Sequence, residues 1–115
     1  MNTTDKEKIE HTIETRKKAH AYYLKKSKVY RAFLDMEKAT YSNGALDKKT
    51  KELIAIGISV VINCESCMEW HIKQALDDGA TGEQVIEAIG VGMEMGGGPA
   101  TASARFAMNV LEHYS

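Results

Sequence analysis

The residues best suited to chemistry lie in one short segment, Cys64-Glu65-Ser66-Cys67-Met68-Glu69-Trp70-His71. Two cysteines at this spacing can close a small disulfide ring if the first lies in a turn and the second begins a helix. Cys67 would then lie at a helix N-terminus, where unpaired N–H groups and the macrodipole stabilise a thiolate. His71 follows four residues later, on the same helical face, and can accept the thiol proton. The segment predicts a redox-active dithiol with Cys67 as nucleophile and Cys64 as its partner.

Such a dithiol is suited to two related reactions. Attack of the thiolate on a peroxide gives a sulfenic acid, which the second thiol condenses to a disulfide. Attack on a disulfide gives a mixed disulfide, which the same second thiol resolves. Glu65 and Glu69 oppose this chemistry, because their charges disfavour a thiolate unless they point to solvent. We expect the helix terminus and His71 to prevail.

Other interpretations of the cysteine pair remain open. A structural zinc site could use Cys64, Cys67 and His71, but it normally needs a fourth ligand, which Glu52, His20 or another subunit would supply. The cysteines could also be inert core residues. Haem attachment needs a histidine directly after the second cysteine, and a thioredoxin-like site needs a strand, which the sequence does not predict. No dinucleotide or phosphate-binding glycine motif is present, so we expect no cofactor.

The elements that must position these residues are predicted to be helices only. There is one proline, and β-branched alternation is scarce, which favours an all-α bundle of about six helices. The turn and capping signals are Asn43-Gly44, Asp47, Gly79, the Thr81–Gln84 capping box and Pro99. They predict helices over 5–26, from Val29 to the turn at 41–44, from Asp47 to 63, from near Cys67 to Gly79, from 81 to about 95, and from Pro99 to Tyr114.

The third predicted helix is unusually apolar, since residues 53–63 carry no charge. A helix that is apolar on every side is buried on every side. A chain of 115 residues offers few elements to cover it, so we expect a homo-oligomer. The first helix is only weakly amphipathic, as expected of an arm that packs on another subunit.

Composition excludes several other classes of protein. Residues 1–52 carry a charge of +5 and the remainder −6, but the lysines alternate with acids and lack interleaved aromatics, so we expect no nucleic-acid partner. No long apolar run predicts a membrane span, and the charged N-terminus predicts no signal peptide. We therefore expect a cytosolic protein. In that compartment a close cysteine pair is more often catalytic or metal-binding than a structural staple.

The pattern Glu52-x11-Cys64-x2-Cys67-x3-His71 resembles the motif of the alkylhydroperoxidase D-like (AhpD-like) branch of the carboxymuconolactone decarboxylase family. The resemblance extends over about residues 43–106. It implies that 1–115 form one domain of this all-helical type, with 1–42 as an N-terminal helical arm and 43–106 as the motif-bearing core. It also implies an obligate oligomer, a trimer or a hexamer. Ser66 stands where the hydroperoxidase itself carries a histidine.

The resemblance implies a role for each motif residue. Cys67 would be the peroxidatic thiol, Cys64 its proton donor and resolving partner, and His71 the base, supported by Glu52 through water. The substrate would be a peroxide or a disulfide, with a separate thiol electron donor. The alternative is the decarboxylase branch, which lacks the cysteine pair and would act on a small carboxylated ring with His71 as acid–base group.

Glu52 is the motif residue whose position needs most explanation. It precedes Cys64 by twelve residues, which in one straight helix is a rise of about 18 Å. The helix must bend, the next helix must cross it, or a neighbouring chain must supply the carboxylate. The simpler interpretation is that Glu52 forms an ion pair with Lys48, four residues earlier.

Overall fold

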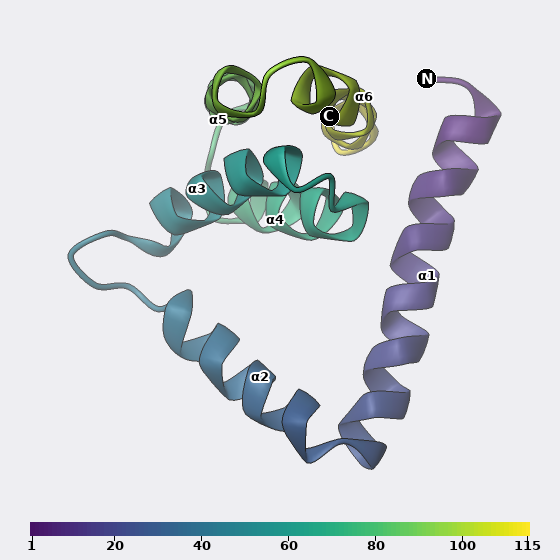
Figure 1. The fold of residues 1–115 in the computed structure, drawn as a ribbon, viewed down its shortest axis with the longest axis vertical. Helices are drawn as coiled ribbons and strands as arrows, with labels where there is room; N and C mark the ends of the chain where they lie inside the picture. Colours follow the sequence, from purple (N-terminus) through teal and green to yellow (C-terminus); the bar gives the residue numbers. More distant parts are fainter.

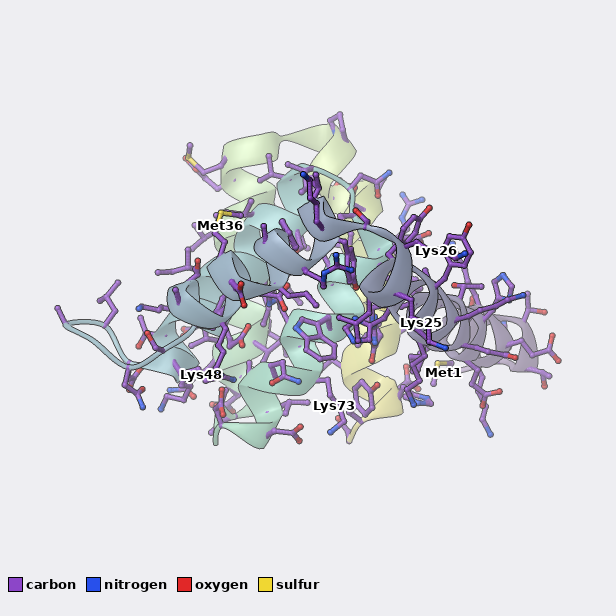
Figure 2. The ribbon with its side chains drawn as sticks, turned by 90° about the horizontal axis from the view of Figure 1, so that it is seen from below. Met1, Lys25, Lys26, Met36, Lys48 and Lys73 are labelled. Atoms are coloured by element: carbon purple, nitrogen blue, oxygen red, sulfur yellow. A yellow bond between two sulfur atoms is a disulfide. The ribbon has the colours of Figure 1, made fainter.

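The computed structural model describes residues 1–115 and contains six helices and no strand, which confirms the predicted all-α class. The helices are α1 (Thr3–Lys26), α2 (Lys28–Thr40), α3 (Lys48–Val61), α4 (Glu65–Asp77), α5 (Gly82–Gly96) and α6 (Gly98–His113). Helices α3 to α6 pack together, while α1 and α2 form a V that extends from one side of them (Figure 1). Seen from below, α2 passes in front of α3 and α4, with Met36 projecting from it (Figure 2).

Most helix ends follow the capping signals in the sequence. Asp47 caps α3 by accepting the Thr50 N–H at 2.8 Å. Thr81 and Gln84 form the predicted capping box of α5. Gly79 follows the end of α4 with a positive φ of 96°, which glycine adopts without strain. The last helix begins one residue earlier than predicted, at Gly98.

The core lies between α3, α4, α5 and α6, with one residue contributed by α1. Ile9, Ile56, Met68, Ile72, Val85 and Val110 are among the fully buried side chains. Helices α3 and α5 approach closely because both carry a glycine at the crossing. A Cβ added at Gly92 would lie 2.6 Å from the Gly57 carbonyl oxygen, so no other residue fits there without a shift. Gly90, on the same helix as Gly92, faces open space.

The first half of α1 packs on its own chain, against α4 and α6. Ile9 is fully buried there. Part of α1 therefore packs within its own chain, where it covers the start of α4.

Helix α2 carries an apolar stripe that no other part of the chain buries. Helix α2 contains no buried residue, and Val29, Phe33 and Met36 are 74%, 50% and 59% exposed. The physical reason is that α2 contacts only α1, so no other element covers its apolar face.

Helix α3 is likewise buried on one side only. Its inner face carries Ile56 and Val60, which are fully buried. Its outer face, with α5, forms an apolar groove that we call the α3–α5 groove; it is lined chiefly by Leu53, Ile54, Ile58, Val61, Val91 and Met95. Ile54 and Ile58 are about half exposed, so the expectation of burial on every side is not met within one chain. None of the six helices combines the length and apolarity needed to span a membrane.

Candidate active site

The cysteine pair lies at the tight connection between α3 and α4. Asn63 adopts a positive φ of 54°, a conformation that asparagine tolerates better than most residues, and the chain reverses there. Helix α4 then begins at Glu65, with Cys64 as its N-cap. The prediction that this helix starts near Cys67 was wrong by two residues. The cause is that the Cys64 sulfur accepts the Cys67 N–H at 3.2 Å and so caps the first turn itself.

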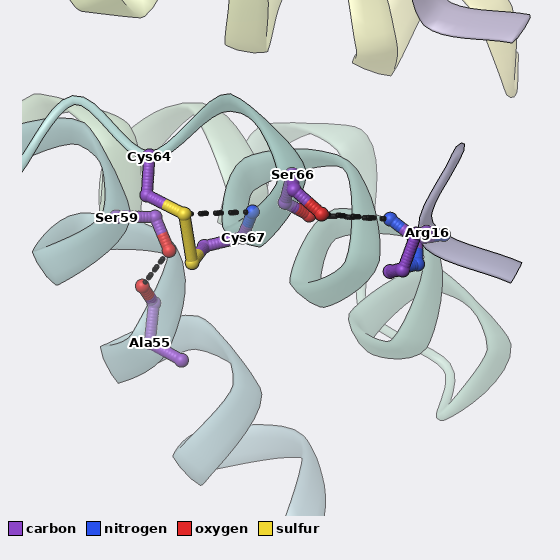
Figure 3. Close-up of a disulfide and its surroundings, with 6 residues drawn as sticks. All are labelled: Arg16, Ala55, Ser59, Cys64, Ser66 and Cys67. Atoms are coloured by element: carbon purple, nitrogen blue, oxygen red, sulfur yellow. Dashed lines mark hydrogen bonds between the residues drawn. A yellow bond between two sulfur atoms is a disulfide. The ribbon is translucent and has the colours of Figure 1, made fainter. Parts of the chain in front are cut away.

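The two sulfurs are joined in a disulfide, and they differ in their surroundings (Figure 3). Cys64 Sγ faces the backbone amide at the helix start. Cys67, in the first turn, lines a cavity of about 420 Å³ between α1, α2 and α4. The other walls of this cavity include Tyr30, Phe33 and Trp70. A molecule in the cavity would therefore meet Cys67 rather than Cys64.

His71 and Glu52 meet within one chain. His71 Nδ1 lies 2.6 Å from Glu52 Oε1, and Glu52 is only 2% exposed. Helix α4 runs back along α3 after the turn, and this brings His71 level with Glu52 in the first half of α3. Neither a bend in α3 nor a second chain is needed. The hydrogen bond places the ring proton of neutral His71 on Nδ1 and leaves Nε2 as the acceptor.

The second carboxylate oxygen of Glu52 contacts Lys48. Lys48 Nζ lies 3.2 Å from Glu52 Oε2 and 2.6 Å from Asp78 Oδ2. The ion pair between Lys48 and Glu52 is therefore present together with the contact to His71. Tyr41 covers the imidazole, with the two ring centres 5.2 Å apart. Burial raises the pKa of Tyr41, and the charges of Glu52 and Glu37 raise it further.

The two glutamates flanking Cys67 are both neutralised by basic residues of α1. Glu65 contacts Lys8 at 2.8 Å. Glu69 is 1% exposed, and its two oxygens contact Arg16 and the Tyr114 hydroxyl. We expected that Glu69 must point to solvent if a thiolate is to be favoured at Cys67. Glu69 is instead buried, and Arg16 compensates its charge inside the fold. Burial and the hydrogen bond to Glu69 raise the pKa of Tyr114.

Arg16 is a site residue that the sequence analysis missed. Its guanidinium donates to the carbonyl and hydroxyl oxygens of Ser66, both at 3.3 Å (Figure 3). The guanidinium also lies 5.1 Å from the centre of the Trp70 ring. It thus holds the first turn of α4, between the two cysteines, from the side of α1. No local pattern could identify it, because Ser66 lies fifty residues away.

The structure gathers no group of three or more His, Cys, Asp or Glu side chains able to hold a metal ion. His20, named above as a fourth ligand, contacts the Tyr30 hydroxyl at 2.7 Å. Glu52 is engaged by His71 and Lys48. The observed contacts thus serve hydrogen bonds and ion pairs, and we propose no metal function.

Comparison with known proteins adds an independent observation. A model of the carboxymuconolactone decarboxylase family matches residues 27–109. "Uncharacterized protein 4 in cox locus" of Paracoccus denitrificans is 48% identical over 81 residues, which is 70% of this chain and 73% of that protein. The alkyl hydroperoxide reductase AhpD of Corynebacterium kroppenstedtii is 35% identical over 48 residues, 42% of this chain but 28% of that protein.

A solved structure agrees over nearly the whole chain. A carboxymuconolactone decarboxylase family protein from Legionella pneumophila superposes with a TM-score of 0.88 and 33% identity, covering 94% of this chain and 97% of that one. The match therefore includes α1 and α2 as well as the helices that carry the cysteine pair.

Proposed function

The chain belongs to the carboxymuconolactone decarboxylase family, and from that premise we propose that it is a thiol–disulfide oxidoreductase that reduces hydroperoxides or disulfides through Cys64 and Cys67. The observation that carries the proposal is the unequal placement of the two sulfurs. Cys67 lines the cavity between α1, α2 and α4, one helical turn before His71, while Cys64 caps the helix. The similarity to AhpD over 48 residues supports the same reading.

In the oxidative half-reaction the Cys67 thiolate attacks a hydroperoxide oxygen. The O–O bond breaks, the sulfur becomes a sulfenic acid, and the alcohol leaves with the proton that His71 took from the thiol. The Cys64 thiolate then attacks the Cys67 sulfur, the S–O bond breaks, and hydroxide leaves as water after protonation. One peroxide and two thiols thus give one alcohol, one water and one disulfide.

In the reductive half-reaction a donor thiolate attacks the Cys67 sulfur from the cavity and expels Cys64 as a thiolate. Expulsion is faster when the leaving thiolate is stabilised. The Cys67 N–H, 3.2 Å from Cys64 Sγ, and the N-terminus of α4 provide that stabilisation. A second donor thiol then resolves the mixed disulfide. The same helix start therefore favours Cys67 as the attacked sulfur and Cys64 as the leaving group.

We also propose that the protein is a homo-oligomer, a trimer or a hexamer. The outer face of α2 and the α3–α5 groove expose large apolar side chains on a small chain. Contiguous apolar patches of this kind on a soluble protein mark interaction sites. Light scattering coupled to gel filtration tests this proposal by measuring the molar mass in solution. The mass of a monomer would contradict it.

The test of the proposed function is peroxide consumption with dithiothreitol as donor. Wild-type protein should turn over, and Cys67→Ser should not. Reduced Cys64→Ser, freed of dithiothreitol before peroxide is added, should stop at a sulfenic acid that dimedone labels at Cys67. Equal turnover of wild type and Cys67→Ser would refute the dithiol mechanism. Activity on a small carboxylated ring that survives loss of both cysteines would instead identify a decarboxylase-type enzyme.

A further inference from the structure

The hydrogen bond between His71 and Glu52 is the inner end of a longer chain of charged groups. One carboxylate oxygen of Glu52 lies 2.6 Å from His71 Nδ1, and the other lies 3.2 Å from Lys48 Nζ. Lys48 in turn contacts Asp78 at 2.6 Å and Gln74 at 3.3 Å. Glu52 is only 2% exposed, whereas the side chains of Lys48 and Asp78 are 32% and 27% exposed. The series therefore links the base of the proposed mechanism to the protein surface.

Helix stability does not explain the position of Lys48. Lys48 is the first residue of α3, directly after the Asp47 cap, and a cation at a helix N-terminus opposes the macrodipole. The order lysine then glutamate at this spacing is also the less favourable one in a helix. Its contacts join the first turn of α3 to the end of α4, where Asp78 is the C-cap. A residue placed against the local helix preference, yet paired on both sides, points to a role for its charge.

That charge acts on Glu52. A buried carboxylate needs compensation, and Glu52 can find it either in Lys48 or in a protonated His71. While Lys48 compensates Glu52, the imidazole can remain neutral, with Nε2 free to take a proton. Without Lys48, the carboxylate would favour the imidazolium. A protonated imidazole cannot act as a base.

Building on the proposed dithiol function, we propose that Lys48 is the positioning residue of the proton relay: by sharing Glu52 with His71, it sets the pH above which the imidazole accepts the thiol proton. Burial lowers the pKa of Lys48, but the hydrogen bonds to Asp78 and Glu52 outweigh this and raise it, so the side chain stays charged.

The other titratable groups near His71 do not supply this positive charge. Tyr41 covers the ring and has a raised pKa, so it is neutral around pH 7. Glu37, on α2, acts on Tyr41 and is an acid. Asp78 is an acid bound to Lys48 itself. Cys67, one turn before His71 on α4, is joined to Cys64 in a disulfide and carries no charge.

The experiment compares Lys48→Met with Lys49→Met, a neighbouring lysine on the same helix that makes no ion pair or side-chain hydrogen bond. The first readout is the titration of the His71 imidazole by NMR, with its signal identified by its loss in His71→Gln. In Lys48→Met the titration midpoint should rise by about one pH unit. In Lys49→Met and in the charge-conserving Lys48→Arg it should stay near the wild-type value.

The second readout is the rate of Cys67 oxidation by peroxide in pre-reduced protein, measured as a function of pH. Its acid-side midpoint should rise in Lys48→Met by the same amount as the NMR midpoint. An unchanged NMR midpoint, or equal shifts in Lys48→Met and Lys49→Met, would overturn the inference. If Lys48→Met does not fold, Lys48→Gln takes its place under the same criteria.

The NMR readout does not depend on catalysis. A raised His71 midpoint in a protein without peroxide or disulfide activity would support the role of Lys48 in positioning and refute the proposed function. An active wild type with an unmoved midpoint would do the reverse.

Discussion

The buried carboxylate of Glu69 allows a prediction that separates charge compensation from packing. Its side chain is 1% exposed and contacts Arg16 and Tyr114, while Arg16 is 25% exposed. Removing one partner of a buried ion pair leaves an uncompensated charge and typically costs about 3–5 kcal/mol. Because Arg16 is partly exposed, water can enter beside Glu69 in its absence. We therefore expect Arg16→Met to lower the free energy of unfolding by about 3 kcal/mol, the lower end of that range.

The double variant Arg16→Met/Glu69→Met should be more stable than Arg16→Met alone. Replacing both members of a buried pair by apolar residues of similar volume is often neutral or stabilising. The Tyr114 hydroxyl loses its acceptor in this variant, but Tyr114 is only partly buried and can bind water. The double variant should thus recover most of the loss, to within about 1 kcal/mol of wild type, the size of an ordinary hydrogen bond.

The assay is urea unfolding followed by far-ultraviolet circular dichroism, at one protein concentration and with the disulfide oxidised. A fixed concentration matters because assembly contributes to apparent stability. The charge-compensation argument fails if the double variant is as unstable as Arg16→Met. It also fails if the loss in the double variant equals the sum of the losses in Arg16→Met and Glu69→Met.

The same Arg16→Met protein, once reduced, should react more slowly with iodoacetamide at neutral pH, because the charge of Glu69, two residues from Cys67, is then no longer compensated by Arg16.

Three further predictions concern the relay, the alkaline limit of stability and the crossing of α3 and α5. His71→Gln should slow oxidation of Cys67 by peroxide by about a hundredfold, and Glu52→Gln by less, in stopped-flow measurements of the pre-reduced protein. The pKa of Tyr114 is raised in the folded protein, so the stability that Tyr114 contributes is complete below the pKa of about 10 that tyrosine has in the unfolded chain. That stability is lost as the pH rises through the folded-state pKa. Tyr114→Phe should therefore reduce the loss of stability at alkaline pH, as measured by urea unfolding. Gly92→Ala should cost about 1–3 kcal/mol of unfolding free energy, because the added Cβ would lie 2.6 Å from the Gly57 carbonyl oxygen. Gly90→Ala, on the same helix with nothing within 4 Å, should instead gain stability by up to about 1 kcal/mol, and equal losses in the two variants would contradict the argument.

The features that the sequence predicted well depend on neighbouring residues. Asp47 and the capping box at Thr81 mark helix starts because a side chain there reaches an amide three residues on. The spacing of Cys67 and His71 on one helix is of the same kind. The start of α4 was misplaced for a local reason too: cysteine is not among the usual capping residues, yet the Cys64 sulfur takes that role here.

The contacts that tie distant parts of the chain together could not be read from local patterns. Glu52 meets His71 because α4 turns back along α3, and the direction of that turn depends on a single positive φ at Asn63. Arg16 meets Glu69 across 53 positions of sequence. The resemblance to the family nevertheless implied that Glu52 supports His71 through water, and in the structure the two side chains are in direct contact. This contact joins residues of two different helices, so the family motif could indicate it whereas the spacing of residues along one helix could not.

The exposed apolar stripe of α2 illustrates what periodicity measures. The stripe of Val29, Phe33 and Met36 predicts that one face of the helix is covered, and it does not say by which chain. In the single chain that face is exposed, and the outer face of α3 is exposed as well. The unmet expectation that α3 is buried on every side and the proposal of an oligomer therefore rest on the same kind of pattern. Because Phe33 also lines the cavity at Cys67, whatever covers α2 would hold one wall of the proposed active site in place.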